Sequence, residues 1–162
     1  MDYGIVIEKI HQELKAYWGK GKVADYIPAL AEVEPKRYGI AIETLDGHSF
    51  QVGDADIRFS IQSISKVFAL AMVTRHLGDR IWKFVGREPS GNPFNSLVQL
   101  EYEHGIPRNP FINAGALVVT DRLMSLYEQP KDAILQFVRG ICGNDDIYYD
   151  KHIALSLIHI SE

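Results

Sequence analysis

The spacing of apolar positions predicts a helix near the start of the chain. Over residues 4–18 apolar and polar residues alternate at helical spacing, and Gly19 and Gly21 then stop the helix. Residues 23–28 have too little periodicity for a long element, so we expect a loop there. The apolar face of the predicted helix consists of Ile7, Ile10, Leu14, Tyr17 and Trp18.

Two short apolar runs predict a β-hairpin. They cover residues 38–45 and 48–52, and Asp46-Gly47 lies between them. An Asp-Gly pair between two such runs is a strong hairpin signal, because these residues tolerate the backbone angles of tight turns. Residues 53–56 then turn the chain toward the next element.

The remaining chain reads as helices separated by loops. An apolar helix follows Ser60, its expected N-cap, and is too apolar for the surface, so we expect it to be central and buried. A short helical segment follows Gly78, a third helix opens at Asn113, and an amphipathic helix runs from Pro130 to about Gly140. The Pro- and Gly-containing stretches 87–95 and 105–111 are expected to be loops. The apolar residues of the central helix are Val67, Phe68, Leu70, Ala71, Val73 and Leu77, and those of the short segment are Ile81, Trp82, Phe84 and Val85.

Composition narrows the class of protein. The chain has 162 residues, 46% apolar content and a net charge of −4, which predicts one soluble core and no nucleic-acid partner. We expect no membrane span and no secretory signal, hence a cytoplasmic location. The single Cys142 excludes an internal disulfide and is interpreted as structural. The histidines lack metal-ligand spacing, so neither a catalytic metal nor a cofactor is expected.

Ser63 and Lys66 are the candidate catalytic pair. Three residues apart at the start of a helix, their side chains project from one face. Burial and the positive end of the helix both favour a neutral lysine, which could take the proton of the serine hydroxyl. Ser65 is a rival hydroxyl without a base three residues on. The spacing alone also fits an ordinary helix with a surface lysine, and the S-D-N and K-T-G elements of β-lactamases are absent.

Four longer stretches occur in order along the chain: GKVADYIP at 21–28, FSIQSISK at 59–66, EPSG at 88–91 and NPFINAGA at 109–116. Together they resemble one family, the serine-dependent glutaminases of bacteria and mitochondria. The resemblance covers residues 17–154. It implies an α+β fold of the β-lactamase/DD-peptidase type, present here as its N-terminal half.

The resemblance also implies roles for five residues. Ser63 matches the nucleophile that attacks the side-chain amide of L-glutamine, and Lys66 matches its base. Tyr26 is similar to a catalytic-pocket tyrosine that contacts substrate, while Gln62 and Asn113 match residues at the amino-acid end of the ligand. From the residues alone, Asn113 is an ordinary N-cap, Tyr26 a half-buried aromatic and Gln62 a first-turn residue.

The expected function is hydrolysis of L-glutamine to L-glutamate and ammonia through a glutamyl-serine intermediate. Two alternatives remain: a penicillin-recognising acyl-serine protein, and a non-catalytic interaction domain. The resemblance further implies a homotetrameric parent enzyme, whose later pocket residues this chain lacks, so the chain alone is expected to be inactive.

The end of the chain departs from the family pattern. We interpret residues 1–154 as the N-terminal part of a glutaminase domain and residues 155–162 as a non-native tail. The tail resembles a translated transposase adapter, and a short amphipathic strand is the alternative.

Overall fold

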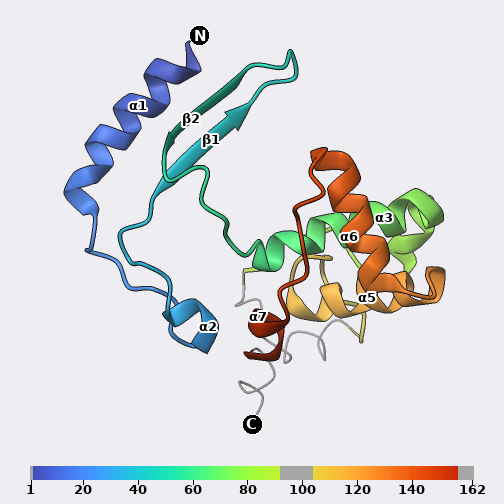
Figure 1. Ribbon diagram of the computed structural model, residues 1–162. Coiled ribbons are helices and arrows are strands. Elements are labelled where there is room, and N and C mark those ends of the chain that lie inside the picture. Colours follow the sequence, from blue (N-terminus) through green and yellow to red (C-terminus); the bar gives the residue numbers. More distant parts are fainter. Residues whose placement is uncertain (1, 92–103, 157–162) are drawn as a thin grey trace. The chain divides into compact units, whose positions relative to one another are not determined.

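The computed structural model describes residues 2–91 and 104–156. They form two compact units, one of residues 2–59 with 150–156 and the other of residues 60–91 with 104–149. The first unit contains helices and a β-hairpin, and the described part of the second contains helices (Figure 1).

The first unit begins with the predicted helix. It is an α-helix, α1, over Tyr3–Leu14, and tightens into a 3-10 turn, η1, over Lys15–Tyr17. Asp2 caps it, since its carboxylate accepts a hydrogen bond from the N–H of Ile5 at 3.2 Å. Of the predicted apolar face only Ile7 is fully buried.

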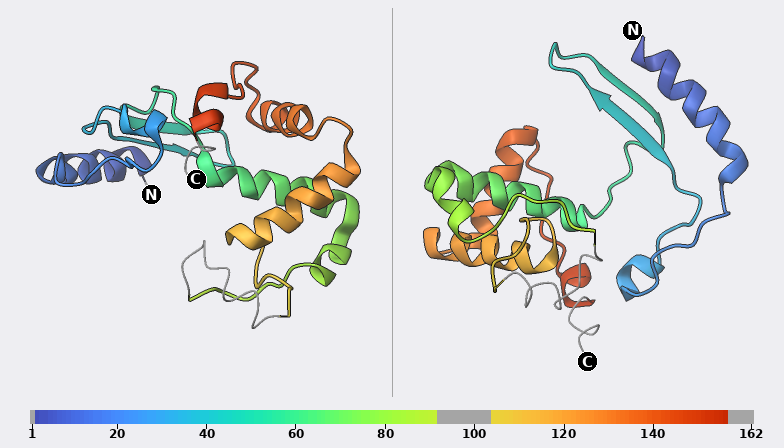
Figure 2. Two further views of the ribbon diagram at one scale, coloured as in Figure 1. Left: turned by 90° about the horizontal axis from the view of Figure 1, so that it is seen from below. Right: turned by 180° about the vertical axis from the view of Figure 1, so that it is seen from behind.

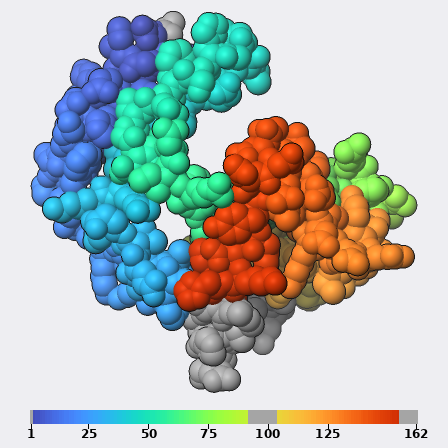
Figure 3. All heavy atoms as spheres, in the orientation of Figure 1, coloured from blue at the N-terminus to red at the C-terminus, as the bar shows by residue number. Residues whose placement is uncertain are grey.

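The hairpin is confirmed, with strand β1 over Gly39–Glu43 and β2 over Ser49–Gly53. The strands are antiparallel, and Ala41 lies opposite Gln51 at the centre. The loop is one residue longer than the Asp-Gly pair, because Thr44 pairs with His48 and Gly47 takes the left-handed conformation at φ +83°. Helix α1 lies against β2 (Figure 3), where the rings of Tyr3 and Phe50 are 6.0 Å apart.

Two short helices complete this unit. Helix α2, Pro28–Ala31, begins at the last residue of the predicted loop and was not predicted. It is a neighbour of α7, Lys151–Ser156. Asp150 caps α7 by accepting from the N–H groups of His152 and Ile153. The proposed boundary at 154 lies within α7, and residues 157–162 lie outside the described residues, so the non-native tail stays a prediction.

The second unit is built on α3, Ser65–Leu77, which follows the 3-10 turn η2, Gln62–Ile64. A 3-10 segment η3, Gly78–Lys83, comes next, and α5, Asn113–Leu126, and α6, Pro130–Cys142, follow the gap in the described residues. Helices α3 and α5 lie side by side, and α6 packs against both (Figure 2). The predicted starts at Asn113 and Pro130 are confirmed.

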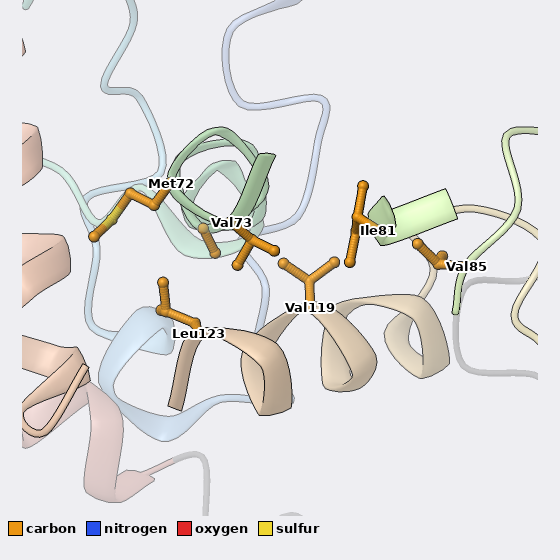
Figure 4. Packing of buried hydrophobic residues seen from close by; sticks show 7 residues of the cluster. Met72, Val73, Ile81, Val85, Val119 and Leu123 are labelled. Atoms are coloured by element: carbon orange, nitrogen blue, oxygen red, sulfur yellow. The ribbon is translucent and has the colours of Figure 1, made fainter. Parts of the chain in front are cut away.

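The core of this unit lies between α3, η3 and α5. Six of its buried side chains are labelled in Figure 4. Val73, Ile81 and Val119 are almost completely inaccessible to solvent, which fixes α3 and α5 against each other. The labelled residues are Met72, Val73, Ile81, Val85, Val119 and Leu123.

Three further details differ from the sequence-based expectations. Ser60 is not an N-cap: α3 starts at Ser65 with Ile64 before it, because a 3-10 turn intervenes. Helix α3 is buried on one face only, and Val67 on another face is 50% exposed. Helix α6 continues two residues past Gly140, because Gly143 supplies the left-handed conformation that ends it.

Candidate functional site

Ser63 and Lys66 occupy the junction between the 3-10 turn and α3. Ser63 is the middle residue of η2 and is exposed, while Lys66 is the second residue of α3 and is half-buried. In a tight turn residues three apart lie on the same side, so the junction keeps both side chains on one face. The predicted pair is therefore placed one turn apart at the start of the central helix of this unit.

The Lys66 amine is held from another part of the chain. Its Nζ donates to the main-chain oxygen of Phe111 and to Oδ1 of Asn113, each at 2.9 Å. Among the described residues, Lys66 forms no ion pair and no hydrogen bond to Ser63 Oγ. Both partners are neutral oxygens, so no carboxylate in the described chain fixes the positive charge.

Desolvation lowers the pKa of Lys66 below its ordinary value. A neutral amine has two N–H groups and one lone pair, and the two oxygen partners match the two N–H groups. The lone pair then remains available to accept a proton. Desolvation, and not these two hydrogen bonds, is what favours the neutral form that a base requires.

Gln62, directly before Ser63, has an unusual backbone. Its φ is +46°, a left-handed value that is uncommon outside glycine, and such strain is concentrated at functional sites. Its side chain donates to Ser60 Oγ at 2.6 Å. Gln62 thus sets the direction in which the chain enters the turn that carries Ser63.

Asn113 is not the N-cap that its position suggested. Ile112 occupies the cap position and Asn113 is the first helical residue, which leaves its side chain free to contact Lys66. The contact joins residues 47 apart in sequence. The structure therefore brings Asn113 and Lys66 together, as the resemblance implied for one site.

Tyr26 belongs to the first unit, whereas the other four predicted residues belong to the second. It precedes α2 and its side chain is 67% exposed, which is more open than the half-buried aromatic expected from the residues alone. Its role in catalysis stays a prediction.

Two contributors to the site were missed at the sequence level. The Phe111 carbonyl contacts Lys66, and Asn109 holds the turn that precedes Phe111. A main-chain oxygen has no sequence signature. The Asn-Pro pair at 109–110 did mark a turn, but a turn signal does not say which side chain the turn will face.

The described residues contain no helix of sufficient length and apolarity to cross a bilayer. In the same residues, no three or more His, Cys, Asp or Glu side chains gather as a metal site would require. Cys142 is a free, exposed thiol at the end of α6.

Fold and site together define an α+β protein with a Ser-x-x-Lys element at the start of a packed helix. The Glutaminase family model matches residues 21–161, and the chain belongs to the glutaminase family. The glutaminase of Salmonella arizonae is 57% identical over 152 residues, which make up 93% of this chain and 49% of the relative. The chain thus spans about half the length of the curated relatives it matches.

Two solved structures also match most of the chain. Mglu, analysed in its tris and glutamate form, is 36% identical with a TM-score of 0.81, and the match covers 93% of this chain and 34% of that chain. Probable glutaminase ybaS is 31% identical with a TM-score of 0.78, over 94% of this chain and 52% of that chain. These matches confirm the α+β, β-lactamase-like fold class, present as part of the longer fold.

A probable glutaminase from Bacillus subtilis, complexed with 6-diazo-5-oxo-L-norleucine, shares the fold alone. It is 23% identical with a TM-score of 0.80, and the match covers the whole of this chain and 49% of that chain.

Proposed function

We propose that this chain supplies the nucleophile and base of a glutaminase that hydrolyses L-glutamine to L-glutamate and ammonia. The observation that carries the proposal is the placement of Lys66, whose amine contacts Phe111 O and Asn113 Oδ1 one turn from Ser63. Family membership supports the substrate, and the glutamate form of Mglu supports glutamate as product.

The proposed reaction has two acyl-transfer steps. Ser63 Oγ attacks the carbon of the γ-carboxamide while the neutral Lys66 amine takes the hydroxyl proton. The proton then passes to the leaving nitrogen, the C–N bond breaks, and ammonia departs from a glutamyl ester on Ser63. Water, deprotonated by the same amine, cleaves the ester to glutamate and restores Ser63.

We assign stabilisation of the negative oxygen that forms when Ser63 attacks the amide carbon to the start of the 3-10 turn. N–H groups at the first positions of a helix have no partner within it, and the main-chain N–H of Ser63 stands at such a position. The strained φ of Gln62 sets how the chain enters this turn.

The amino-acid end of glutamine needs polar partners, because a zwitterion is costly to desolvate. We assign part of this task to Asn113 and Gln62, and contact with the substrate to Tyr26. Asn113 Nδ2 remains available for a ligand carboxylate because its Oδ1 is taken by Lys66. These residues alone leave the ammonium group without a carboxylate partner, so we expect the isolated chain to release no ammonia above background.

The test joins residues 1–154 of this chain to the remainder of the Salmonella arizonae glutaminase and measures ammonia release from L-glutamine. The chimera should be active, and Ser63→Ala should lower kcat by about 10³-fold or more. Ser65→Ala, which removes the neighbouring hydroxyl, is the matched control and should retain most activity. A folded chimera without activity, or equal losses in the two variants, would contradict the proposal.

A covalent probe locates the nucleophile directly. The glutamine analogue 6-diazo-5-oxo-L-norleucine carries a diazoketone, which alkylates an activated nucleophile with loss of N₂. Mass spectrometry of the treated chimera should find the adduct on the peptide that contains Ser63, and not in Ser63→Ala. An adduct on Ser65 instead would reassign the nucleophile.

We further propose a homotetrameric parent enzyme in the cytoplasm. The free, exposed Cys142 thiol supports a reducing compartment, and the tetramer rests on the family resemblance. Light scattering of the purified chimera tests the tetramer, and fractionation of the source cells tests the location.

A further inference from the structure

The side chain of Asn109 forms three hydrogen bonds, all to main-chain groups near the lysine site. Its Oδ1 accepts from the N–H groups of Phe111 at 2.9 Å and Ile112 at 3.1 Å. Its Nδ2 donates to the Glu88 carbonyl at 2.9 Å. One amide therefore closes the turn before α5 and ties that turn to the segment that follows η3.

The turn is also fixed by main-chain contacts. Gly86 N–H donates to Pro107 O at 2.7 Å, and Glu88 N–H donates to Arg108 O at 3.0 Å. These bonds align residues 86–88 with 107–108 but end before Phe111. Beyond them, Asn109 Oδ1 holds the N–H groups of Phe111 and Ile112.

The closed turn presents two groups to Lys66. The Phe111 carbonyl follows directly after the N–H that Asn109 holds, and Asn113 begins the helix one residue past Ile112. Both oxygens lie 2.9 Å from Lys66 Nζ, whereas the hydrogen bonds of the Asn109 side chain go to main-chain groups. Any rotation of the turn would move both oxygens at once.

We propose that Asn109 is a positioning residue for the Lys66 base. By fixing the Phe111 carbonyl and the start of α5, Asn109 positions the two oxygens that accept from the N–H groups of the neutral amine, and the lone pair is left for the Ser63 hydroxyl. This inference rests on the proposed function, since it gives Asn109 a task only if Lys66 takes a proton. A mere loop anchor would hold the turn without affecting the state of the amine.

The test follows the titration of Lys66 by NMR in this chain with ¹³C-labelled lysine, assigned with Lys66→Arg. Asn109→Ala opens the turn and admits water, so the Lys66 pKa should rise by about half a unit or more toward the value of about 10.4 for free lysine. Asn109→Ser keeps a shorter, uncharged acceptor for the same N–H groups and should give a smaller rise.

The matched control is Asn144→Ala. Asn144 Oδ1 accepts from Asp146 N–H at 2.8 Å in a turn after α6, so the substitution removes the same type of hydrogen bond elsewhere in the same unit. It should leave the Lys66 titration unchanged. Amide exchange at Phe111 and Ile112 should accelerate in Asn109→Ala and not in Asn144→Ala.

Each alternative result has one meaning. Faster exchange at Phe111 and Ile112 with an unchanged Lys66 titration would reduce Asn109 to a loop anchor and overturn the inference. An equal shift in Asn144→Ala would also overturn it. If Asn109→Ala does not fold, Asn109→Ser decides by the same criteria. An ordinary lysine pKa in the unsubstituted chain would contradict Lys66 as the base, a failure of the proposed function that is visible before any variant is made.

Discussion

Replacing Gly115 with alanine should destabilise the chain because the first turn of α5 touches another backbone segment. A Cβ at this position would lie 1.9 Å from the Asn109 carbonyl oxygen and 2.8 Å from its carbon. Real Cβ contacts do not fall below 3.0 Å, so the backbone must move by about 1 Å. Both clashing atoms are main-chain atoms, so no side chain can rotate away to relieve the contact.

The expected magnitude follows from two opposing terms. Overpacking against a rigid backbone costs up to about 3 kcal/mol. Alanine in place of glycine inside a helix recovers about 1 kcal/mol. The free energy of unfolding should therefore fall by about 2 kcal/mol, which at a typical urea dependence lowers the midpoint by about 1 M.

Gly140→Ala is the matched control. Gly140 lies in α6, and nothing approaches its Cβ position within 4 Å. The same substitution should therefore raise the free energy of unfolding, by up to about 1 kcal/mol. Urea denaturation followed by circular dichroism measures both variants. Equal effects, or a Gly115→Ala chain as stable as the unsubstituted one, would refute the argument from close backbone packing.

Further predictions concern the base, the hairpin and the core. In the chimera, Lys66→Ala should lower the rate of ammonia release about as much as Ser63→Ala. The activity of the unsubstituted chimera should rise with pH through a group whose pKa lies below that of free lysine. Near-normal turnover in Lys66→Ala would remove Lys66 from the mechanism. Hydrogen bonds from Thr44 and His48 lower the pKa of Asp46 below 3.8. The Asp46 carboxylate should therefore stabilise the hairpin above that pH, and this contribution should be lost as the pH falls through the lowered pKa. An acid titration of the hairpin NMR shifts should show the loss, and Asp46→Asn should remove the pH dependence. Leu123→Ala should lower the free energy of unfolding by about 2–5 kcal/mol, because Leu123 is buried in the core. Leu117 lies in the same helix and is 69% exposed, so Leu117→Ala should change the free energy of unfolding by less than about 0.5 kcal/mol. Similar melting temperatures of the two variants would contradict the assigned core.

Local signals in the sequence were sufficient for most elements of secondary structure. Asp46-Gly47 located the hairpin, and Pro130 located the start of α6, because turn and cap preferences act within a few residues. The boundaries were less certain. The 3-10 turn at Gln62–Ile64 displaced the expected cap at Ser60, since a left-handed backbone at a residue other than glycine has no local marker.

Sequence patterns also located the candidate site residues, but not their contacts. The Ser63-x-x-Lys66 spacing and the family stretches are properties of the sequence, and they led to the family to which the chain belongs. The environment of Lys66 is a tertiary property: its partners lie 45 and 47 residues away and reach it only because α3 and α5 pack together.

The same distinction explains Asn113 and Asn109. Taken alone, Asn113 reads as a helix cap, because capping is what an asparagine before an apolar helix does locally. Packing places Lys66 beside it, and the cap position passes to Ile112. Asn109 shows only a turn signal until the fold brings the Glu88 carbonyl and the Phe111 peptide within reach of one amide. The sequence determined which residues were available, and long-range packing decided which of them meet, because hydrogen bonds between distant residues form only where the core holds their backbones in register.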